Sequence, residues 1–258
     1  MYFRYIKLKF VGIKLWRWLL LVIFYFMIIF FDIKAHAGNY SLIEFIIREL
    51  NEYFNICYYF LFAIVIISSD IYDSSNEIFY NHFIIKMGRA KYIKANIIYT
   101  IILSLIILTI FIFIILVIYL ITFKAIYIPN ENNMMDLGLI NLSWASGFLF
   151  SFSLILFRLI FLNSGVFLTN FKLNYPIGFL FPFFITIIDW WFYEIFQIME
   201  PIFILPIEHS RIFYTEAVAP AVNNILRVSY GISYIYWLVL IGVELIFMTI
   251  FINKRDFS

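Results

Sequence analysis

Two charged residues lie inside long apolar runs, where an ionised side chain is costly. Arg158 falls in the run that begins near Leu142, and Glu244 falls in the last apolar run of the chain. A charge at the centre of a bilayer costs about 2.5–3.5 kcal/mol on insertion scales. If both runs are spanning helices, the two side chains differ in depth by roughly 6 Å, at about 1.5 Å of rise per residue. We expect either a structural Arg158–Glu244 ion pair or, for Arg158, snorkelling to the headgroups.

Glu208, His209 and Ser210 have the residue types of a hydrolytic triad, but they are adjacent in the chain. Neighbours on one backbone are poorly placed to converge on one proton path, which favours an ordinary loop. The chain contains no G-x-S-x-G, no H-E-x-x-H and no G-x-x-x-x-G-K-[ST] motif. We therefore expect no catalytic site, no metal and no cofactor in this chain.

A polar and basic stretch, 68–96, separates two apolar segments. Ser74 and Glu77 have the S-x-x-E spacing of a capping box. Gly88 lies where a left-handed residue would end the helix, and Lys86 lies in its last turn, near the negative end of the dipole. The spacing predicts a short helix over Ser75–Met87, which we interpret as the contact for a soluble partner.

The two faces of this predicted helix differ in character, which suits a contact that is partly buried. If it docks a partner, apolar side chains form the buried part of the contact and polar ones its rim; otherwise the segment lies on the inner leaflet. The apolar set is Ile78, Phe79, Phe83 and Ile84, and the candidate contact residues as a whole are Ser74, Glu77, Ile78, Phe79, Asn81, His82, Phe83, Lys86 and Arg89.

Composition places the chain among membrane proteins. Hydrophobic residues make up 65% of its 258 residues and charged residues only 13%, against about 25% in an ordinary soluble domain. The lone Cys57 excludes a disulfide framework. We predict an all-α polytopic membrane protein with six transmembrane helices. The expected spans are Trp18–Ile33, Tyr53–Ser69, Ile97–Phe123, Leu142–Leu162, Pro176–Trp191 and Tyr230–Ile252.

Three stretches outside these spans are also apolar in part. Residues 1–17 carry five basic and no acidic side chains, which predicts an interfacial amphipathic helix on an anionic leaflet. A signal peptide is the alternative, but no convincing small-residue cleavage site follows. The segment 41–50 is expected to lie on the membrane. Residues 192–229 contain three prolines and only short apolar runs, which predicts a re-entrant helical segment between spans five and six.

Basic residues are distributed unevenly between the loops. With the N-terminus inside, twelve Lys and Arg lie on the cytoplasmic side, including those of the loop 70–95, and five lie outside. The positive-inside rule therefore predicts that both termini are cytoplasmic. Asp189, Trp190 and Trp191 then close the fifth span at the outer interface. Tryptophans there are typical membrane anchors, and the alternative is the floor of an outer gate.

These features together resemble the ABC-2 type permeases of ATP-binding cassette transporters. The local similarity is Glu77, followed about ten residues later by Gly88-Arg89-Ala90-Lys91-Tyr92-Ile93-Lys94-Ala95. This is similar to the family's acidic residue and its Gly/Ser-Arg-x-x-(aromatic or Ile) run into the third span. The ending Lys254-Arg255-Asp256 resembles the family's frequent basic-Asp ending, whereas Asn96 stands where a lysine is common.

The resemblance implies that 18–258 form a permease domain and that the short helix is a coupling helix in a cleft of a separate ATPase subunit. Two permease copies would join two ATP-binding subunits in a bacterial plasma membrane, with no enzyme activity on this chain and no nucleic acid. Small permeases of this kind often export, or give immunity to, amphipathic peptides, so we expect such a substrate. The alternative is a non-transporting scaffold or sensor that docks another cytosolic partner.

Overall fold

The computed structural model is helical in every stretch of the chain that it describes. The described residues are 2–36, 40–52, 55–73, 83–123, 143–172, 180–188 and 230–254, and no strand occurs among them. The all-α class that the composition predicts is thus confirmed. The elements are α1 (Tyr2–Gly12), α2 (Leu15–His36), α3 (Leu42–Asn51), the π-helix η2 (Asn55–Tyr59), α4 (Phe60–Asp73), α6 (Arg89–Phe123), α8 (Trp144–Lys172) and α11 (Tyr230–Lys254), with shorter helical stretches at 83–87 and 180–188.

Four of the described helices are long and apolar enough to cross a membrane. Their candidate spans are Leu15–Ile33, Arg89–Phe123, Trp144–Leu168 and Gly231–Lys254, which correspond to the first, third, fourth and sixth spans expected from the sequence. The expected second span coincides with η2 and α4, whose 5 and 14 residues follow one another directly. The helical stretch 180–188 falls within the expected fifth span. The full six-span arrangement remains a prediction.

Two of the helices continue well past the apolar runs that predict them. α6 begins at Arg89 rather than near Ile97, and α8 ends at Lys172 rather than near Leu162. The 35 residues of α6 extend roughly 50 Å at about 1.5 Å per residue, beyond the roughly 30 Å hydrocarbon core of a bilayer. Polar residues in these extensions do not break the helices, because Asn96 and Asn163 form hydrogen bonds inside the bundle.

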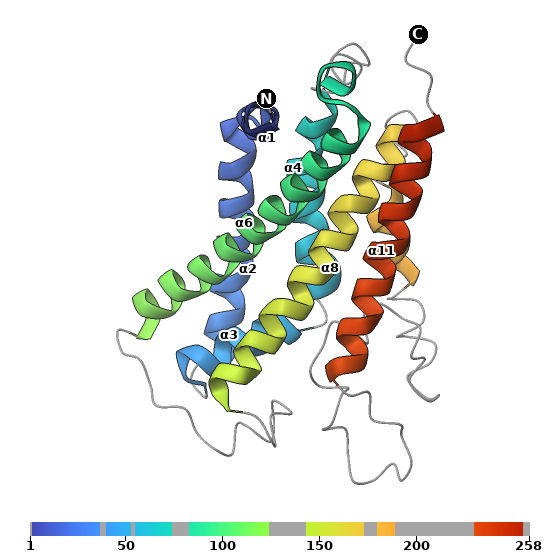
Figure 1. Ribbon diagram of the computed structural model, residues 1–258. Coiled ribbons are helices and arrows are strands. Elements are labelled where there is room, and N and C mark those ends of the chain that lie inside the picture. Colours follow the sequence, from blue (N-terminus) through green and yellow to red (C-terminus); the bar gives the residue numbers. More distant parts are fainter. Residues whose placement is uncertain are drawn as a thin grey trace.

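α6 and α8 form the centre of the bundle. α8 lies between α6 and α11, and α2 packs on α6 (Figure 1). Phe111 of α6 contacts Tyr25 of α2 and Phe60 of α4, with ring centroids 5.1 Å apart in both pairs. Within lipid, where apolar burial drives little association, such packing contacts and interhelical hydrogen bonds hold helices together.

α3 is packed inside the protein, which differs from the membrane-surface position expected for the segment 41–50. Its N-cap is a capping box, in which Ser41 Oγ accepts from the Glu44 N–H and the Glu44 carboxylate accepts from the Ser41 N–H. Asn51 Nδ2 donates to Ser151 Oγ of α8, at 2.7 Å. Seven residues of α3 are buried, so both its apolar and polar side chains are covered by protein.

One end of the bundle gathers the basic stretches of the sequence. α1, the start of α6, and the ends of α8 and α11 lie at this end, which is uppermost in Figure 1. Arg89 Nη1 donates to the Asn253 carbonyl at 2.8 Å and so links α6 to α11. We call it the basic end and define it by Arg4, Lys7, Lys9, Lys14, Arg17, Lys86, Arg89, Lys91, Lys94 and Lys254. The side of a membrane that it faces remains a prediction.

Candidate functional site

The helix end predicted at Gly88 is confirmed. Gly88 has φ of 78°, in the left-handed region, and its N–H donates to the Ile84 carbonyl at 2.9 Å. This is the closing bond of a left-handed helix C-cap. The Gly88 carbonyl in turn accepts from the N–H of Tyr92 in α6, at 3.1 Å. The stretch 83–87 and α6 therefore meet at a single left-handed residue.

We call the stretch 83–87, Gly88 and the start of α6 the joint. The inner face of the joint is packed against α1. Phe83, Ile84 and Met87 are buried, and the Phe83 ring centroid lies 5.0 Å from that of Tyr5. Phe83, which the sequence assigns to a partner contact, thus contacts this chain's own N-terminal helix. Lys86, also assigned to that contact, is exposed beside Ile85, whose side chain is 67% exposed. The surface open to a partner is the outer face of the joint.

Asn96 of α6 accepts hydrogen bonds from two side chains of α1. Tyr5 Oη and Lys9 Nζ donate to Asn96 Oδ1 at 2.9 and 2.5 Å, while Asn96 Nδ2 donates to the Tyr92 carbonyl. Tyr5 and Lys9 are spaced four residues apart, so they share the buried face of α1, and Ile13 directly after the helix is buried as well. That spacing, with a lysine in the apolar register, is the sequence signal that could have shown Lys9 to be buried, although it does not indicate its partner.

Lys9 is enclosed by aromatic rings. Its Nζ lies 4.7 Å from the ring centroid of Phe167, 4.8 Å from that of Tyr99 and 5.2 Å from that of Tyr5, within the range of cation–π contacts. Burial lowers the pKa of Lys9 to about 7 because the charged form loses its hydration. The α1 contact with the bundle therefore contains a group that changes charge near neutral pH.

The opposite face of α1 is exposed and is both basic and apolar. Arg4 and Lys7 are exposed there, as are Phe3 and Val11. This face fits the interfacial position that the sequence predicts for residues 1–17. α1 thus has one face for the bundle and one for its surroundings.

The two charged residues of the apolar runs are both buried, but no ion pair between them occurs in the described part of the chain. The carboxylate of Glu244 instead accepts a hydrogen bond from Ser164 of α8. One position earlier, Asn163 Nδ2 donates to Ser104 Oγ of α6 at 2.9 Å. The Ser164 contact, not the ion pair, is what links α11 to α8 at Glu244.

A small cavity of about 10 Å³ lies between α6 and α8, lined among others by Thr100 and Asn163. It has room for about one water molecule. Tyr99 and Phe167 also line this cavity, and the rings of both residues contact the Lys9 ammonium. The cavity therefore adjoins the Lys9 contact between α6 and α8.

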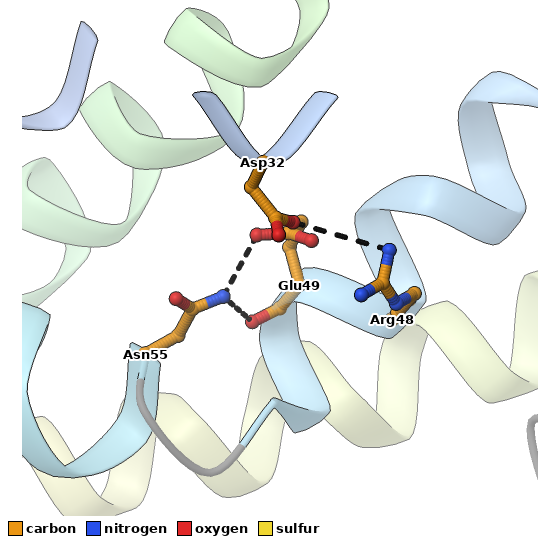
Figure 2. A network of polar contacts seen from close by, with 4 residues as sticks. All are labelled: Asp32, Arg48, Glu49 and Asn55. Atoms are coloured by element: carbon orange, nitrogen blue, oxygen red, sulfur yellow. Dashed lines mark hydrogen bonds and ion pairs between the residues drawn. The ribbon is translucent and has the colours of Figure 1, made fainter. Parts of the chain in front are cut away.

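A second polar cluster, drawn in Figure 2, lies around α3 at the other end of the bundle (Figure 1). Asn55 Nδ2 of η2 donates to the Glu49 carbonyl at 2.7 Å and to Glu49 Oε2 at 2.8 Å. Arg48 Nη1 lies 3.9 Å from Asp32 Oδ2 of α2. These four residues join α2, α3 and η2, and nothing in the sequence pattern brings them together.

Several predicted site residues fall outside the described part of the chain. They are Ser74, Glu77, Ile78, Phe79, Asn81, His82, Asp189, Trp190 and Trp191, together with the segment 192–229. Within the described ranges no group of three His, Cys, Asp or Glu side chains could hold a metal ion.

Comparison of the chain with protein-family models, with curated proteins and with solved structures finds no match. The function must therefore be inferred from the chain's own residues and their geometry.

Proposed function

We propose that this chain is the membrane-spanning permease subunit of an ABC exporter in a bacterial plasma membrane. Two copies form the translocation path, and two separate ATP-binding subunits drive it. The carrying observation is the joint at Gly88, where a short helical stretch leads through one left-handed residue into the longest helix of the described chain.

The contacts of the joint would transmit a displacement of the stretch 83–87 to the helices of the bundle. Phe83 and Ile84 are buried, and the Phe83 ring contacts Tyr5 of α1, so the stretch 83–87 cannot shift without moving its neighbours. Arg89 is bonded to the end of α11 through the Asn253 carbonyl. A push on this joint would therefore reach α1, α6 and α11 together, because packed helices move as rigid elements.

An amphipathic peptide taken up from the membrane is the substrate that we propose. Long apolar faces of α2 and α11 are exposed, including Ile23, Ile235 and Ile246. Such faces suit lateral entry of an amphipathic helix or contact with the second permease copy.

The proposal is tested by purifying the tagged chain from its native membranes in mild detergent and measuring ATP hydrolysis by the complex. We expect the wild-type chain to co-purify with an ATP-binding subunit at equal stoichiometry. The Lys86→Glu variant should lose most of the bound subunit and most of the ATP hydrolysis. Lys7→Glu, a charge reversal on the exposed face of α1, is the matched control and should retain both.

Two outcomes would contradict the exporter role. One is a purified complex without ATP hydrolysis, and the other is equal activity in the Lys86→Glu and Lys7→Glu variants. A stable cytosolic partner without ATPase activity would favour the scaffold or sensor class instead.

A further inference from the structure

Glu49 is buried, and its two carboxyl oxygens have different surroundings. The residue is 1% exposed. Its Oε2 accepts from Asn55 Nδ2 at 2.8 Å, whereas Oε1 receives no hydrogen bond from an N–H or hydroxyl group of the described residues. A buried carboxylate oxygen without a donor is costly. Oε1 therefore lacks the partner that an ionised group requires.

The carboxyl group of Glu49 faces that of Asp32 from α2 (Figure 2), close enough for a side-chain hydrogen bond between the two acids. Two ionised carboxylates can only accept, so a bond between them requires one proton. Carboxyl pairs of this kind share a proton because like charges at contact distance cannot both ionise. The Asp32–Glu49 contact thus contains a place for one proton.

The charges around the pair balance with that proton in place. Arg48, 3.9 Å from Asp32, supplies one positive charge against the one negative charge that remains. Tyr59 of η2 is a further titratable group near the pair, and the charges of Glu49, Asp32 and Glu52 act on its phenol. α6 contributes the phenol of Tyr119, bonded to the Tyr40 carbonyl, and α8 contributes the uncharged Ser151.

We propose that Asp32 and Glu49 form a proton-binding site and that its proton holds α3 and η2 against α2. Loss of the proton leaves two negative charges facing each other, on the buried Glu49 and the partly buried Asp32, with one Arg48 beside them. Their repulsion separates α3 from α2, and η2 follows α3 because Asn55 is bonded to both the backbone and the side chain of Glu49. The site is far from the basic end (Figure 1), so it does not depend on the exporter role.

The pKa of Glu49 agrees in direction with this geometry. Burial raises it well above its ordinary value of 4.5, and the hydrogen bond to Asp32 and the charge of that group raise it further, while Asn55 and Arg48 act in the opposite direction. Above pH 4.5 the folded chain then binds a proton that the unfolded chain has lost. Folding stability at this site therefore falls as pH rises.

The test is the thermal unfolding midpoint of the full chain in detergent micelles between pH 5 and pH 8, compared with the Glu49→Gln variant. Glutamine resembles the protonated acid, so we expect similar midpoints at pH 5 and a wild-type midpoint that falls below the variant's as pH rises. Glu52→Gln is the control and should follow the wild type. Comparison at equal pH cancels contributions from other titrating groups, including Lys9.

Infrared spectroscopy supplies a readout that does not depend on the stability of one variant. Wild-type protein at pH 7 should show a protonated-carboxyl band that is missing in Glu49→Gln or, should that variant fail to fold, in Asp32→Asn. The proposal is overturned if neither substitution removes such a band, or if the midpoints of wild type and Glu49→Gln run parallel across the pH range.

Discussion

Lys9 and Asn96 are 87 positions apart in the sequence, yet the Lys9 ammonium lies 2.5 Å from Asn96 Oδ1. The bond attaches the N-terminal helix to the extension of α6 that follows Gly88. The same ammonium sits among the rings of Tyr5, Tyr99 and Phe167. Attachment of α1 therefore depends on the charge state of one buried lysine.

The first prediction concerns the pH dependence of this attachment. The pKa of Lys9 is about 7 in the folded chain, against 10.5 for an ordinary lysine, so between these values the unfolded chain binds more protons. Stability at this site therefore rises with pH over that interval, with a slope of at most about 1.4 kcal/mol per pH unit. Denaturant unfolding in micelles at pH 7 and pH 9 measures it.

Lys9→Met isolates the contribution, because methionine keeps the apolar stem and removes the titrating group. We expect the variant to lose the rise between pH 7 and pH 9, whereas Lys7→Met, on the exposed face of α1, should keep it. A rise of equal size in Lys9→Met would show that another group is responsible.

The second prediction compares two helical glycines. A Cβ added at Gly165 in α8 would lie 2.0 Å from Phe181 Cε1, whereas a Cβ at Gly242 in α11 would meet nothing within 4 Å. Gly165→Ala should lower stability by about 1–3 kcal/mol through overpacking, and Gly242→Ala should be neutral or slightly stabilising. Unfolding midpoints of the two variants measure the difference, and equal midpoints would mean that Phe181 moves away without cost.

The third prediction concerns the link between α3 and α8. Asn51 Nδ2 donates to Ser151 Oγ at 2.7 Å and to the Ile47 carbonyl at 2.7 Å. In a double-mutant cycle of Asn51→Ala and Ser151→Ala, we expect a coupling energy of about 1 kcal/mol. Strictly additive effects would mean that the hydrogen bond contributes nothing to the position of α3.

Local sequence signals predicted the local structure well. The left-handed end at Gly88 followed from a glycine placed after a basic last turn, and its φ confirms it. The apolar runs located α2, α6, α8 and α11 because hydrocarbon thickness fixes a minimum length. The helices α6 and α8 extend beyond these runs, and Asn96 and Asn163, just outside the predicted spans, form side-chain hydrogen bonds within the protein.

Contacts between distant segments could not be predicted from the sequence. Nothing in the pattern pairs Lys9 with Asn96, Glu244 with Ser164, or Glu49 with Asp32, because each depends on how the helices cross. The segment 41–50, which contains Glu49, is predicted from the sequence to lie on the membrane. Its acidic residues, Glu44 and Glu49, are instead buried, and Asn55, Arg48 and Asp32 lie around Glu49.

The central claim is that the joint at Gly88 faces the cytoplasm, where a partner can move it. A Cys57→Ser background makes an introduced cysteine the single thiol of the chain. Ile85→Cys then reports on the joint, and Ser143→Cys, an exposed position at the start of α8, reports on the other end. The measurement is labelling by a membrane-impermeant maleimide in intact cells and in inside-out vesicles. We predict that Ile85→Cys reacts in inside-out vesicles alone and Ser143→Cys in intact cells alone, whereas labelling of Ile85→Cys in intact cells would contradict the account.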